Sequence, residues 1–449
     1  MIAERDRHAA SPVHETALDC VEAGIEAADP GRAIRDGVTL EGDRLTVDGD
    51  AYDLGDFEEV VLLGGGKAAG AVAVELESIL GDRLAGGAVV VPDPVEELEG
   101  GRVAVFVGGH PLPDEGSVEG ARRLLELADD SDERTLVLAV VTGGGSATLA
   151  APAERLSLAD LRATTEALLS AGVDIDGINA VRKHVSAIKG GLLARAAAPA
   201  TVVGLLVSDV VGDDPAVIAS GPTAPDGTTY DDALAVLDGN GVAVPEAVRR
   251  HLEAGAAGRR PETPRAGDPI FDQVTNRVLL NNWTALAAAR DVAADRGYSP
   301  CVVSSRLRGE AREAAPFHAA VAEEVASTGN PVAAPGALLS GGELTVTVRG
   351  EGEGGPSLEF ALATSLELSG TREPLSGAVL AAVDTDGRDG STDAAGAIVD
   401  ADTVDDGESA RHALAANYAH RYLDERGALV VTGVTGTNVN DLRVLLVPR

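Results

Sequence analysis

The sequence predicts two α/β domains, and three observations lead to this fold class. The 449 residues are enough for two domains with sizeable cores. Short apolar runs alternate with amphipathic stretches along most of the chain, as in parallel sheets covered by helices. A stretch rich in Pro, Gly and charge, AGAAGRRPETPRAG at 254–267, separates two such series. We therefore expect a first domain over 1–253, a linker or exposed connection over 254–275 and a second domain over 276–449.

The apolar and amphipathic patterns place the elements in order. After a helical pattern over 12–28 and a hairpin near 40–47, uninterrupted apolar runs predict strands at 60–63, 88–91, 103–106, 135–141 and 201–207. Helices are predicted at 68–80, 117–128, 158–171 and 178–196. The second domain is predicted to have helices at 283–296 and 309–327 and strands at 278–280, 301–303, 337–339, 344–348, 378–383, 428–431 and 442–447. The ligand site is expected in the cleft between the domains.

The composition excludes several classes of protein. The 36 basic and 72 acidic residues give a net charge of −36, which argues against binding to nucleic acid or to an anionic membrane. Only three of the basic residues are lysines. Such a surface suggests a halophilic protein, because concentrated salt screens the self-repulsion. Two cysteines, the lack of a leader pattern and the lack of a long apolar run favour a cytoplasmic protein.

Lys67 stands out because lysine is so rare in this chain. It follows an apolar run and Gly64–Gly66, at a point where a strand is expected to turn into a helix. Backbone N–H groups at such a turn bind anions, and a flexible ammonium suits phosphate. The stretch also matches the loose dinucleotide pattern G-x-G-x-x-A, with Asp93 near the position of a ribose-binding acid. It is not a Walker A loop, because Ala68 follows the lysine.

A second glycine turn, TGGGSA at 142–147, follows another predicted strand. Turns at the carboxyl ends of parallel strands face one crevice, where open α/β sheets bind ligands. Ser146 lacks the G-x-S-x-G elbow of a nucleophilic serine. It is therefore expected either to hydrogen-bond a substrate or phosphate or to serve as a helix N-cap.

Basic residues and one histidine add candidates for anion binding. Arg182 and Lys189 are seven residues apart on the predicted helix 178–196 and would share a face, with Lys183 displaced by about 100°. They would bind an anionic ligand or pair with carboxylates. His110 lies in the predicted turn GGHPLPD at 108–114, where a binding and a structural role are equally compatible with the sequence.

Acidic loops follow two of the predicted strands. One is SDVVGDD at 208–214, and the other is DTDGRDGSTD at 384–393, which is not a calcium loop because Ala395 takes the place of the glutamate at position 12. Carboxylates at strand ends suit a magnesium ion that carries nucleotide phosphates. The alternative is that both are solvated loops of a very acidic protein. The polar turn at 432–441 similarly needs a ligand or water as hydrogen-bond partner.

Taken together, these motifs resemble the glycerate 2-kinase family of the glycerate kinase/MOFRL type. The resemblance covers nearly the whole chain and rests on GGGKAAG at 64–70, GGHPLPDEGS at 108–117, TGGGSATL at 142–149, INAVRKHVSAIKGGLLA at 178–194, SDVVGDDPAVIASGPTAPD at 208–226, LLSGGELTV at 338–346, DTDGRDGSTDAAGA at 384–397 and TGTNVNDL at 435–442. It implies a Rossmann-like amino-terminal domain with a parallel sheet, a smaller MOFRL α/β domain at about 333–445 and an active site between them. The implied reaction is phosphorylation of D-glycerate at the 2-hydroxyl by ATP, with a divalent cation such as Mg²⁺, to give 2-phosphoglycerate and ADP.

The resemblance also implies roles for individual residues. Lys67 would neutralise charge on the transferring phosphoryl group, and Asp209 or Asp386 would handle charge and the hydroxyl proton. Asp213 and Asp389 would hold the cation. The remaining substrate- or phosphate-binding candidates are Gly65, Gly66, His110, Gly144, Gly145, Ser146, Arg182, Lys189, Glu343 and Asn438.

Three positions differ from the family pattern. GPSLE at 355–359 lacks the usual arginine and amides, Tyr418 and its neighbours replace an Asn-Asp-Ser run, and Val434 replaces a proline. Arg388 is a candidate replacement for the arginine. Two alternative functions stay open: an NAD(P)H-dependent hydroxypyruvate reductase, indicated by the dinucleotide pattern and Asp93, and a member that binds nucleotide or acid without turnover. The sequence also leaves open whether the chain forms a homo-oligomer.

Overall fold

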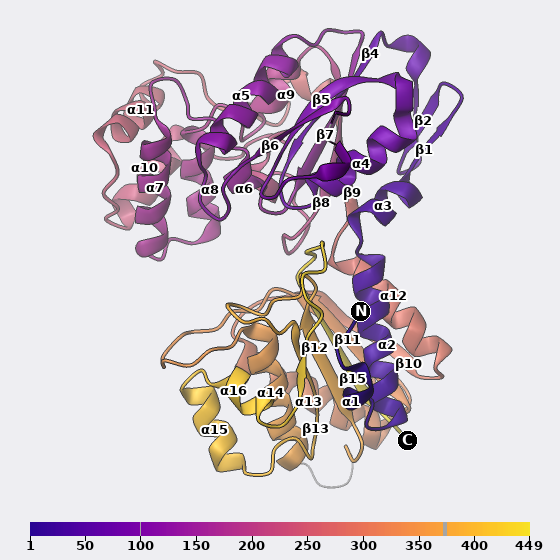
Figure 1. The fold of residues 1–449 in the computed structure, drawn as a ribbon. Helices are drawn as coiled ribbons and strands as arrows, with labels where there is room; N and C mark the ends of the chain where they lie inside the picture. The colour runs from indigo at the N-terminus through magenta and orange to yellow at the C-terminus, as the bar shows by residue number, and fades with distance from the viewer. Residues whose placement is uncertain (99, 371–374) are drawn as a thin grey trace. The chain divides into compact units, whose positions relative to one another are not determined.

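The computed structural model describes residues 1–98, 100–370 and 375–449, which form two compact units (Figure 1). The continuous unit is Pro30–Leu279, and the split unit is Met1–Asp29 together with Leu280–Arg449. Each contains a six-stranded sheet with helices, so the predicted class of two α/β domains is confirmed. The division differs from the expected boundaries at the amino terminus, where the first 29 residues belong with the second half of the chain.

The continuous unit is built on a sheet of order β6-β5-β4-β7-β8-β9, in which the ladders joining β6, β5, β4, β7 and β8 are parallel. All eight residues of β7 are buried, as expected for a parallel strand covered on both faces. The strands are β4 (Glu59–Gly65), β5 (Leu84–Val91), β6 (Val103–Val107), β7 (Thr135–Thr142), β8 (Thr201–Val207) and β9 (Val274–Leu280).

Helices of the continuous unit form two groups. The first lies along the sheet, where Leu124 and Leu193 join the strand residues Leu63 and Val137 in one core; it comprises α4 (Ala69–Leu80), α5 (Glu115–Asp129), α6 (Gly145–Thr148) and α9 (Leu192–Ala197). The second has its own apolar core beyond the sheet (Figure 1); it comprises α7 (Leu158–Ser170), α8 (Ile175–His184), α10 (Tyr230–Gly239) and α11 (Glu246–Ala256). The unit begins with α3 (Pro30–Gly37) and a small antiparallel sheet of β1 (Val38–Glu41), β2 (Arg44–Val47) and β3 (Asp50–Asp53).

Two predictions for this unit differ from the structure. The expected helix 178–196 is wrong, because α8 ends at His184 and α9 begins at Leu192. Residues 254–275, expected as a linker or exposed connection, belong to the continuous unit. There the carbonyl of Pro264 accepts the Asp226 amide at 2.8 Å and Thr263 donates to the Asp226 carboxylate at 2.9 Å, so the segment is hydrogen-bonded to the loop before α10.

The split unit has a mixed sheet of order β10-β11-β15-β12-β13-β14. β10 and β11 are parallel, whereas the other ladders are antiparallel. The last strand of the chain therefore lies in the middle of the sheet. The strands are β10 (Ser299–Leu307), β11 (Gly336–Gly342), β12 (Val379–Asp384), β13 (Gly396–Asp400), β14 (Leu429–Val430) and β15 (Asp441–Val447).

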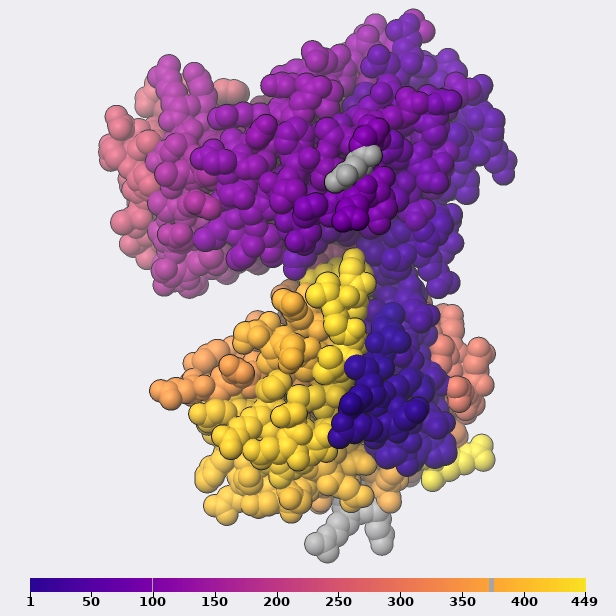
Figure 2. Space-filling model, viewed as in Figure 1, coloured from indigo at the N-terminus to yellow at the C-terminus, as the bar shows by residue number. Residues whose placement is uncertain are grey.

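Alternate residues of β15 point to opposite faces of this sheet. Val444 joins a core with α2 (Pro12–Ala27) and α12 (Asn282–Asp295), whereas Leu445 joins the core of the other face. The short helix α1 (Arg5–His8) contributes no buried residue. Figure 2 shows the indigo amino-terminal residues packed against the yellow carboxyl-terminal segment. The second face carries α13 (Ala311–Thr328), α14 (Pro356–Gly370), α15 (Gly407–Ala415) and α16 (Ala419–Asp424).

The predicted strand 344–348 is wrong. Thr345 forms only an isolated bridge with Glu310, whose side chain also accepts the Thr347 amide, so the backbone of this segment is bound locally and joins no ladder. Strand β13 and helix α14 were not predicted. Among the described residues, no helix is long and apolar enough to cross a membrane.

Candidate active site

Two glycine turns meet at the carboxyl ends of the neighbouring strands β4 and β7. Gly65 ends β4, and the amide of Lys67 donates to the carbonyl of Gly143 at 2.8 Å. Gly66 has φ +122°, and a Cβ on it would lie 2.2 Å from Thr142 Oγ1. Only glycine allows this close approach. The structure thus brings together the two turns that the sequence places at strand ends.

Three ionisable side chains surround the second turn. A Cβ on Gly144 would lie 2.9 Å from Lys67 Cγ and 3.2 Å from His110 Cδ2, and one on Gly143 would lie 2.2 Å from an Asp209 oxygen. Burial raises the pKa of Asp209, while a backbone hydrogen bond and the charge of Lys67 oppose this rise. Partial burial, followed by the charge of Lys67, lowers the pKa of His110. A cation therefore lies beside an aspartate with a raised pKa and a histidine with a lowered pKa.

A pocket of about 200 Å³ lies beside the second turn, with Gly144 on its edge. Drug-sized ligands usually occupy about 300–1,000 Å³, so this pocket suits a smaller molecule. Part of its wall is apolar, including Ala147, Ala150 and Leu161. Its polar lining comprises His110, Ser146, Thr164, Thr165, Arg182, Ser186 and Lys189.

Arg182 and Lys189 both line this pocket, although not for the predicted reason. Arg182 is on α8, whereas Lys189 lies in the following turn, which ends with Gly190 at φ +59° and Gly191 at φ +79°. Burial and the charge of Arg182 lower the pKa of Lys189 to about 7. Burial also lowers the pKa of Arg182. Among the described residues, neither side chain forms an ion pair with a carboxylate.

Ser146 enters the pocket from the short helix α6. The cap of that helix is Gly144, and Gly145 is its first residue, so the N-cap interpretation of Ser146 is wrong. Instead, Ser146 Oγ lies 3.1 Å from Ser220 Oγ, which donates to Asn179 Oδ1 at 2.9 Å. Ser220 and Asn179 were not predicted from the sequence. The sequence feature that could have indicated them is a small polar residue next to apolar ones.

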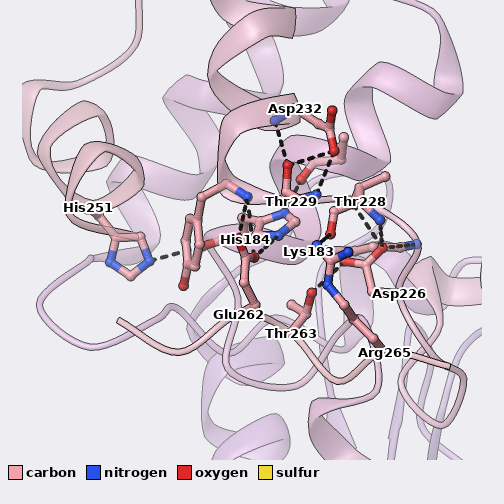
Figure 3. A network of polar contacts seen from close by, with 12 residues as sticks. Lys183, His184, Asp226, Thr228, Thr229, Asp232, His251, Glu262, Thr263 and Arg265 are labelled. Carbon is pink, nitrogen blue, oxygen red and sulfur yellow. Dashed lines mark hydrogen bonds and ion pairs between the residues drawn. The ribbon is translucent and has the colours of Figure 1, made fainter. Parts of the chain in front are cut away.

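Lys183 lies outside this pocket and has a structural environment (Figure 3). Its ammonium is 3.1 Å from the buried Asp226 carboxylate, which also accepts from Thr228 and Thr263. The side chain of His184 is 3.3 Å from Glu262 in the same network. These contacts join α8 to the segment 254–267, so Lys183 stabilises the continuous unit.

The candidates in the split unit lie on loops. Asp386 is half-buried and accepts the Arg388 amide at 2.9 Å. The Asn438 side chain accepts the Asn440 amide at 3.0 Å, and Glu343 is exposed after β11. Each loop thus holds a polar side chain near the end of a strand.

Asp389, expected to bind a metal, has a different environment. Its oxygens accept the amides of Gly355, Ser357 and Leu358 at 3.0, 3.0 and 2.8 Å. It therefore caps the first turn of α14. The other expected metal ligand, Asp213, lies in the continuous unit with φ +61°. Within residues 1–98, 100–370 and 375–449, no group of three or more His, Cys, Asp or Glu could hold a metal ion.

A buried polar cluster in the split unit was not predicted either. Arg443 is fully buried, pairs with Asp441 and lies with its guanidinium carbon 5.0 Å from the ring centre of Phe360. Asp441 is opposite Asp384 in the ladder of β12 and β15. Burial and then the charge of Asp441 raise the pKa of Asp384. Strand pairing between distant parts of the chain brings these charges together, and local patterns carry no signal of it.

The structure accommodates the segment in which the family arginine is missing. Pro356 begins α14, a position that suits its fixed φ. Glu359 pairs with Arg312 at 2.7 Å and accepts from Asn417 at 2.7 Å. A guanidinium from α13 thus neutralises this glutamate, whereas Arg388 is exposed on the loop after β12.

Comparisons with known proteins agree with this architecture. A model described as "Domain of unknown function (DUF4147)" matches residues 16–253, and one described as "MOFRL family" matches 336–441. Glycerate 2-kinase of Pyrococcus horikoshii is 38% identical over 445 residues, 98% of each chain. A putative hydroxypyruvate reductase of Agrobacterium vitis is 41% identical, covering 86% of this chain and 87% of its own. The crystal structure of glycerate kinase from Thermotoga maritima matches with a TM-score of 0.82 and 36% identity, over 96% of this chain and 99% of that one. The chain therefore belongs to the glycerate 2-kinase family.

Proposed function

We propose that the protein is an ATP-dependent D-glycerate 2-kinase, which transfers the γ-phosphoryl group of ATP to the 2-hydroxyl of D-glycerate and releases 2-phosphoglycerate and ADP. The observation that carries the proposal is the glycine turn with Lys67 and Asp209 beside a small pocket lined by the buried Lys189 and the half-buried Arg182. The names of the relatives support the same reaction.

Phosphoryl transfer depends mainly on positioning and on neutralising charge. The Lys67 ammonium would stabilise the negative charge on the transferring phosphoryl group. Asp209, whose raised pKa makes it a better proton acceptor than an ordinary aspartate, would take the proton of the 2-hydroxyl. His110 borders both the turn and the pocket, where its imidazole would orient the D-glycerate substrate. Asp386 is the corresponding candidate in the split unit.

A divalent cation such as Mg²⁺ would bind with the ATP phosphates and neutralise part of their charge. Magnesium usually keeps several waters and contacts one or two protein carboxylates, so a site of this kind needs no cluster of three acidic side chains. Asp213, on the loop after β8, would hold it. Asp389 is the weaker candidate, because its oxygens already accept three backbone amides.

A hydroxypyruvate reductase is the second candidate, because one relative carries that name. Asp93 is exposed just after β5, next to β4 and its glycine turn, where an acid would bind a ribose. A reductase would oxidise NAD(P)H in the presence of hydroxypyruvate without ATP. A member that binds without turnover would show ATP binding by calorimetry and no product.

The kinase is tested by incubating the protein with ATP, a divalent cation and D-glycerate in molar KCl and following products by phosphorus NMR, which separates 2- from 3-phosphoglycerate. We expect 2-phosphoglycerate and ADP in equal amounts. Lys67→Ala should lower kcat by about 10²- to 10³-fold, as loss of one transition-state donor does. The control is Arg250→Ala, which removes an exposed positive charge from α11. Unchanged kcat and KM in Lys67→Ala would remove this residue from the mechanism.

We further propose that the protein works in the cytoplasm of a cell with concentrated internal salt. Its net charge of −36 supports this proposal.

A further inference from the structure

The pocket of the continuous unit is lined by two basic side chains, the buried Lys189 and the half-buried Arg182, which pair with no carboxylate among the described residues. Elsewhere in this unit the buried Lys183 pairs with Asp226, whereas among the described residues Arg182 and Lys189 have no carboxylate partner. Within the described part of the chain, the Lys189 ammonium donates only to the Ala219 carbonyl, at 3.5 Å. Burying a charge without a partner is costly. A buried ammonium and a half-buried guanidinium on one pocket, both without a carboxylate partner among the described residues, therefore indicate a site built for an anion.

We infer that Arg182 and Lys189 bind the carboxylate of the hydroxy-acid substrate, and that Ser146, positioned by Ser220, binds its remaining hydroxyl. This inference rests on the proposed kinase function and assigns the acid, not ATP, to the pocket.

The size and lining of the pocket favour a small carboxylate over a nucleotide phosphate chain. Its volume of about 200 Å³ is below the usual range for larger ligands. The apolar side chains of Ala147, Ala150 and Leu161 suit a carbon skeleton. The planar fork of Arg182 matches a carboxylate in two parallel hydrogen bonds. Because Gly144 and His110 border both this pocket and Lys67, an acid held here would direct another group toward the proposed transfer site.

The chain of hydrogen bonds behind the pocket determines whether Ser146 donates a hydrogen bond to a ligand or accepts one from it. A hydroxyl has one proton to donate, and Ser220 gives its proton to Asn179 Oδ1. The bond of 3.1 Å between the two serines must then be donated by Ser146. This leaves the lone pairs of Ser146 Oγ as acceptors for a ligand hydroxyl. The 2-hydroxyl reacts, so the 3-hydroxyl of glycerate is the group that Ser146 would accept.

The backbone around Ser220 fixes this arrangement. Ser220 is fully buried with φ +63°, and Ala219 before it has φ +49°. Non-glycine residues adopt this region at an energetic cost. The Ser220 carbonyl accepts the Gly190 amide at 3.0 Å, and the Ala219 carbonyl accepts from Lys189. One strained segment therefore positions both the serine and the lysine.

The first test separates the two substrates kinetically. Arg182→Met and Lys189→Met should each raise KM for D-glycerate by about 10- to 100-fold, the value of a hydrogen bond to a charged group. KM for ATP should stay within about twofold, because the lost contact is to the other substrate. A rise in KM for ATP with KM for glycerate unchanged would assign the cations to phosphate and overturn the inference. No change in either constant would also overturn it.

The second test uses proton uptake, which a purely structural lysine would not show. The only charged or titratable side chains found with Lys189 on the pocket are Arg182 and His110, within the described lining. With a pKa of about 7, free Lys189 is mostly neutral at pH 8, and a bound carboxylate would raise its pKa. Calorimetry of D-glycerate binding at pH 8, in buffers of different ionisation enthalpy, should show proton uptake by the wild type. Lys189→Arg should keep binding and lose the uptake; equal uptake in both proteins would contradict the inference.

The third test addresses Ser146 and Ser220. The ratio of kcat/KM for D-glycerate over D-lactate, which lacks the 3-hydroxyl, should fall about tenfold in both Ser146→Ala and Ser220→Ala. Arg250→Ala, which alters an exposed side chain outside the pocket lining, should keep the wild-type ratio. An unchanged ratio in Ser146→Ala would overturn the hydroxyl assignment. Failure of the kinase proposal itself is separable: the wild type would then bind D-glycerate with Lys189-dependent proton uptake but form no 2-phosphoglycerate.

Discussion

Lysine occurs at only three positions, and the structure gives each a different environment. Lys67 is exposed beside two glycine turns, Lys183 is buried with Asp226, and Lys189 is buried without a carboxylate partner among the described residues. A chain that otherwise uses arginine for positive charge thus keeps lysine where a compact or titratable ammonium differs most from a guanidinium. Residue rarity was a signal for Lys67 and Lys189, but it could not distinguish them from Lys183, because the Asp226 partner is 43 residues away.

The two buried lysines should respond oppositely to replacement by methionine. Lys189 has a folded pKa of about 7 against 10.5 in the unfolded chain, so the unfolded state binds more protons between these values. The free-energy cost of burying the charged ammonium is therefore fully present below pH 7, and it disappears as pH rises from 7 to 10.5. Lys189→Met should be more stable than wild type at pH 6, by at most about 1.4 kcal/mol for each pH unit that separates the two pKa values. This gain should shrink toward pH 10.

Lys183→Met is the matched control. It leaves Asp226 buried without its ammonium, which typically costs about 3–5 kcal/mol. Free energies of unfolding from denaturant titrations in molar KCl at several pH values measure both effects. A stability gain in Lys189→Met that is the same at pH 6 and 10 would show that burial does not lower the pKa of Lys189.

Most elements with long apolar runs could be predicted from the sequence, since strands 60–63, 135–141 and 201–207 all lie within β4, β7 and β8. The predicted helix 178–196 was wrong where Gly190 and Gly191 take positive φ, a breaker that the local sequence did contain. The pairing of β15 between β11 and β12 could not be predicted, because it joins strands that are far apart in the chain. In the candidate site, too, only features of the local sequence could be predicted. Turns at strand ends were found, whereas Ser220 and Asn179, brought in by tertiary packing, were not.

The first turn of α14 gives a prediction at the level of an element. Asp389 accepts three amides of this turn, and both of its oxygens are acceptors. Asp389→Asn would turn an NH₂ group toward an N–H donor, so it should reduce the free energy of unfolding by about 1–3 kcal/mol. Asp386→Asn in the same loop is the control, because Asp386 accepts the nearby Arg388 amide and caps no helix. Equal losses in the two variants, measured by denaturant titration, would show that the cap does not stabilise α14.

At the scale of the whole molecule, the net negative charge affects folding stability more than individual ion pairs do. Many arginines form exposed pairs with carboxylates, such as Arg249 with Asp238 and Arg421 with Glu425, and such pairs each contribute little. The chain has 72 acidic and only 36 basic residues, so half of the carboxylates would lack a basic partner even if every basic residue formed a pair. The excess repels itself throughout the chain. Folding should therefore depend on the ions in solution, because the unfolded chain keeps its carboxylates farther apart.

We accordingly expect the melting temperature to rise as KCl increases from about 0.1 M to 1 M, where the Debye length shortens from about 10 to 3 Å. Screening acts at the lower end of this range, whereas exclusion of solutes from the surface continues to act in concentrated solutions. Calorimetric scans in KCl and in sucrose of matched osmolality separate the two causes: repulsion predicts stabilisation by KCl and little by sucrose at low concentration. A melting temperature that is the same in 0.1 M and molar KCl would contradict this prediction. Equal stabilisation by sucrose would instead assign the effect to burial of apolar surface, so the −36 charge would then serve solubility without governing stability.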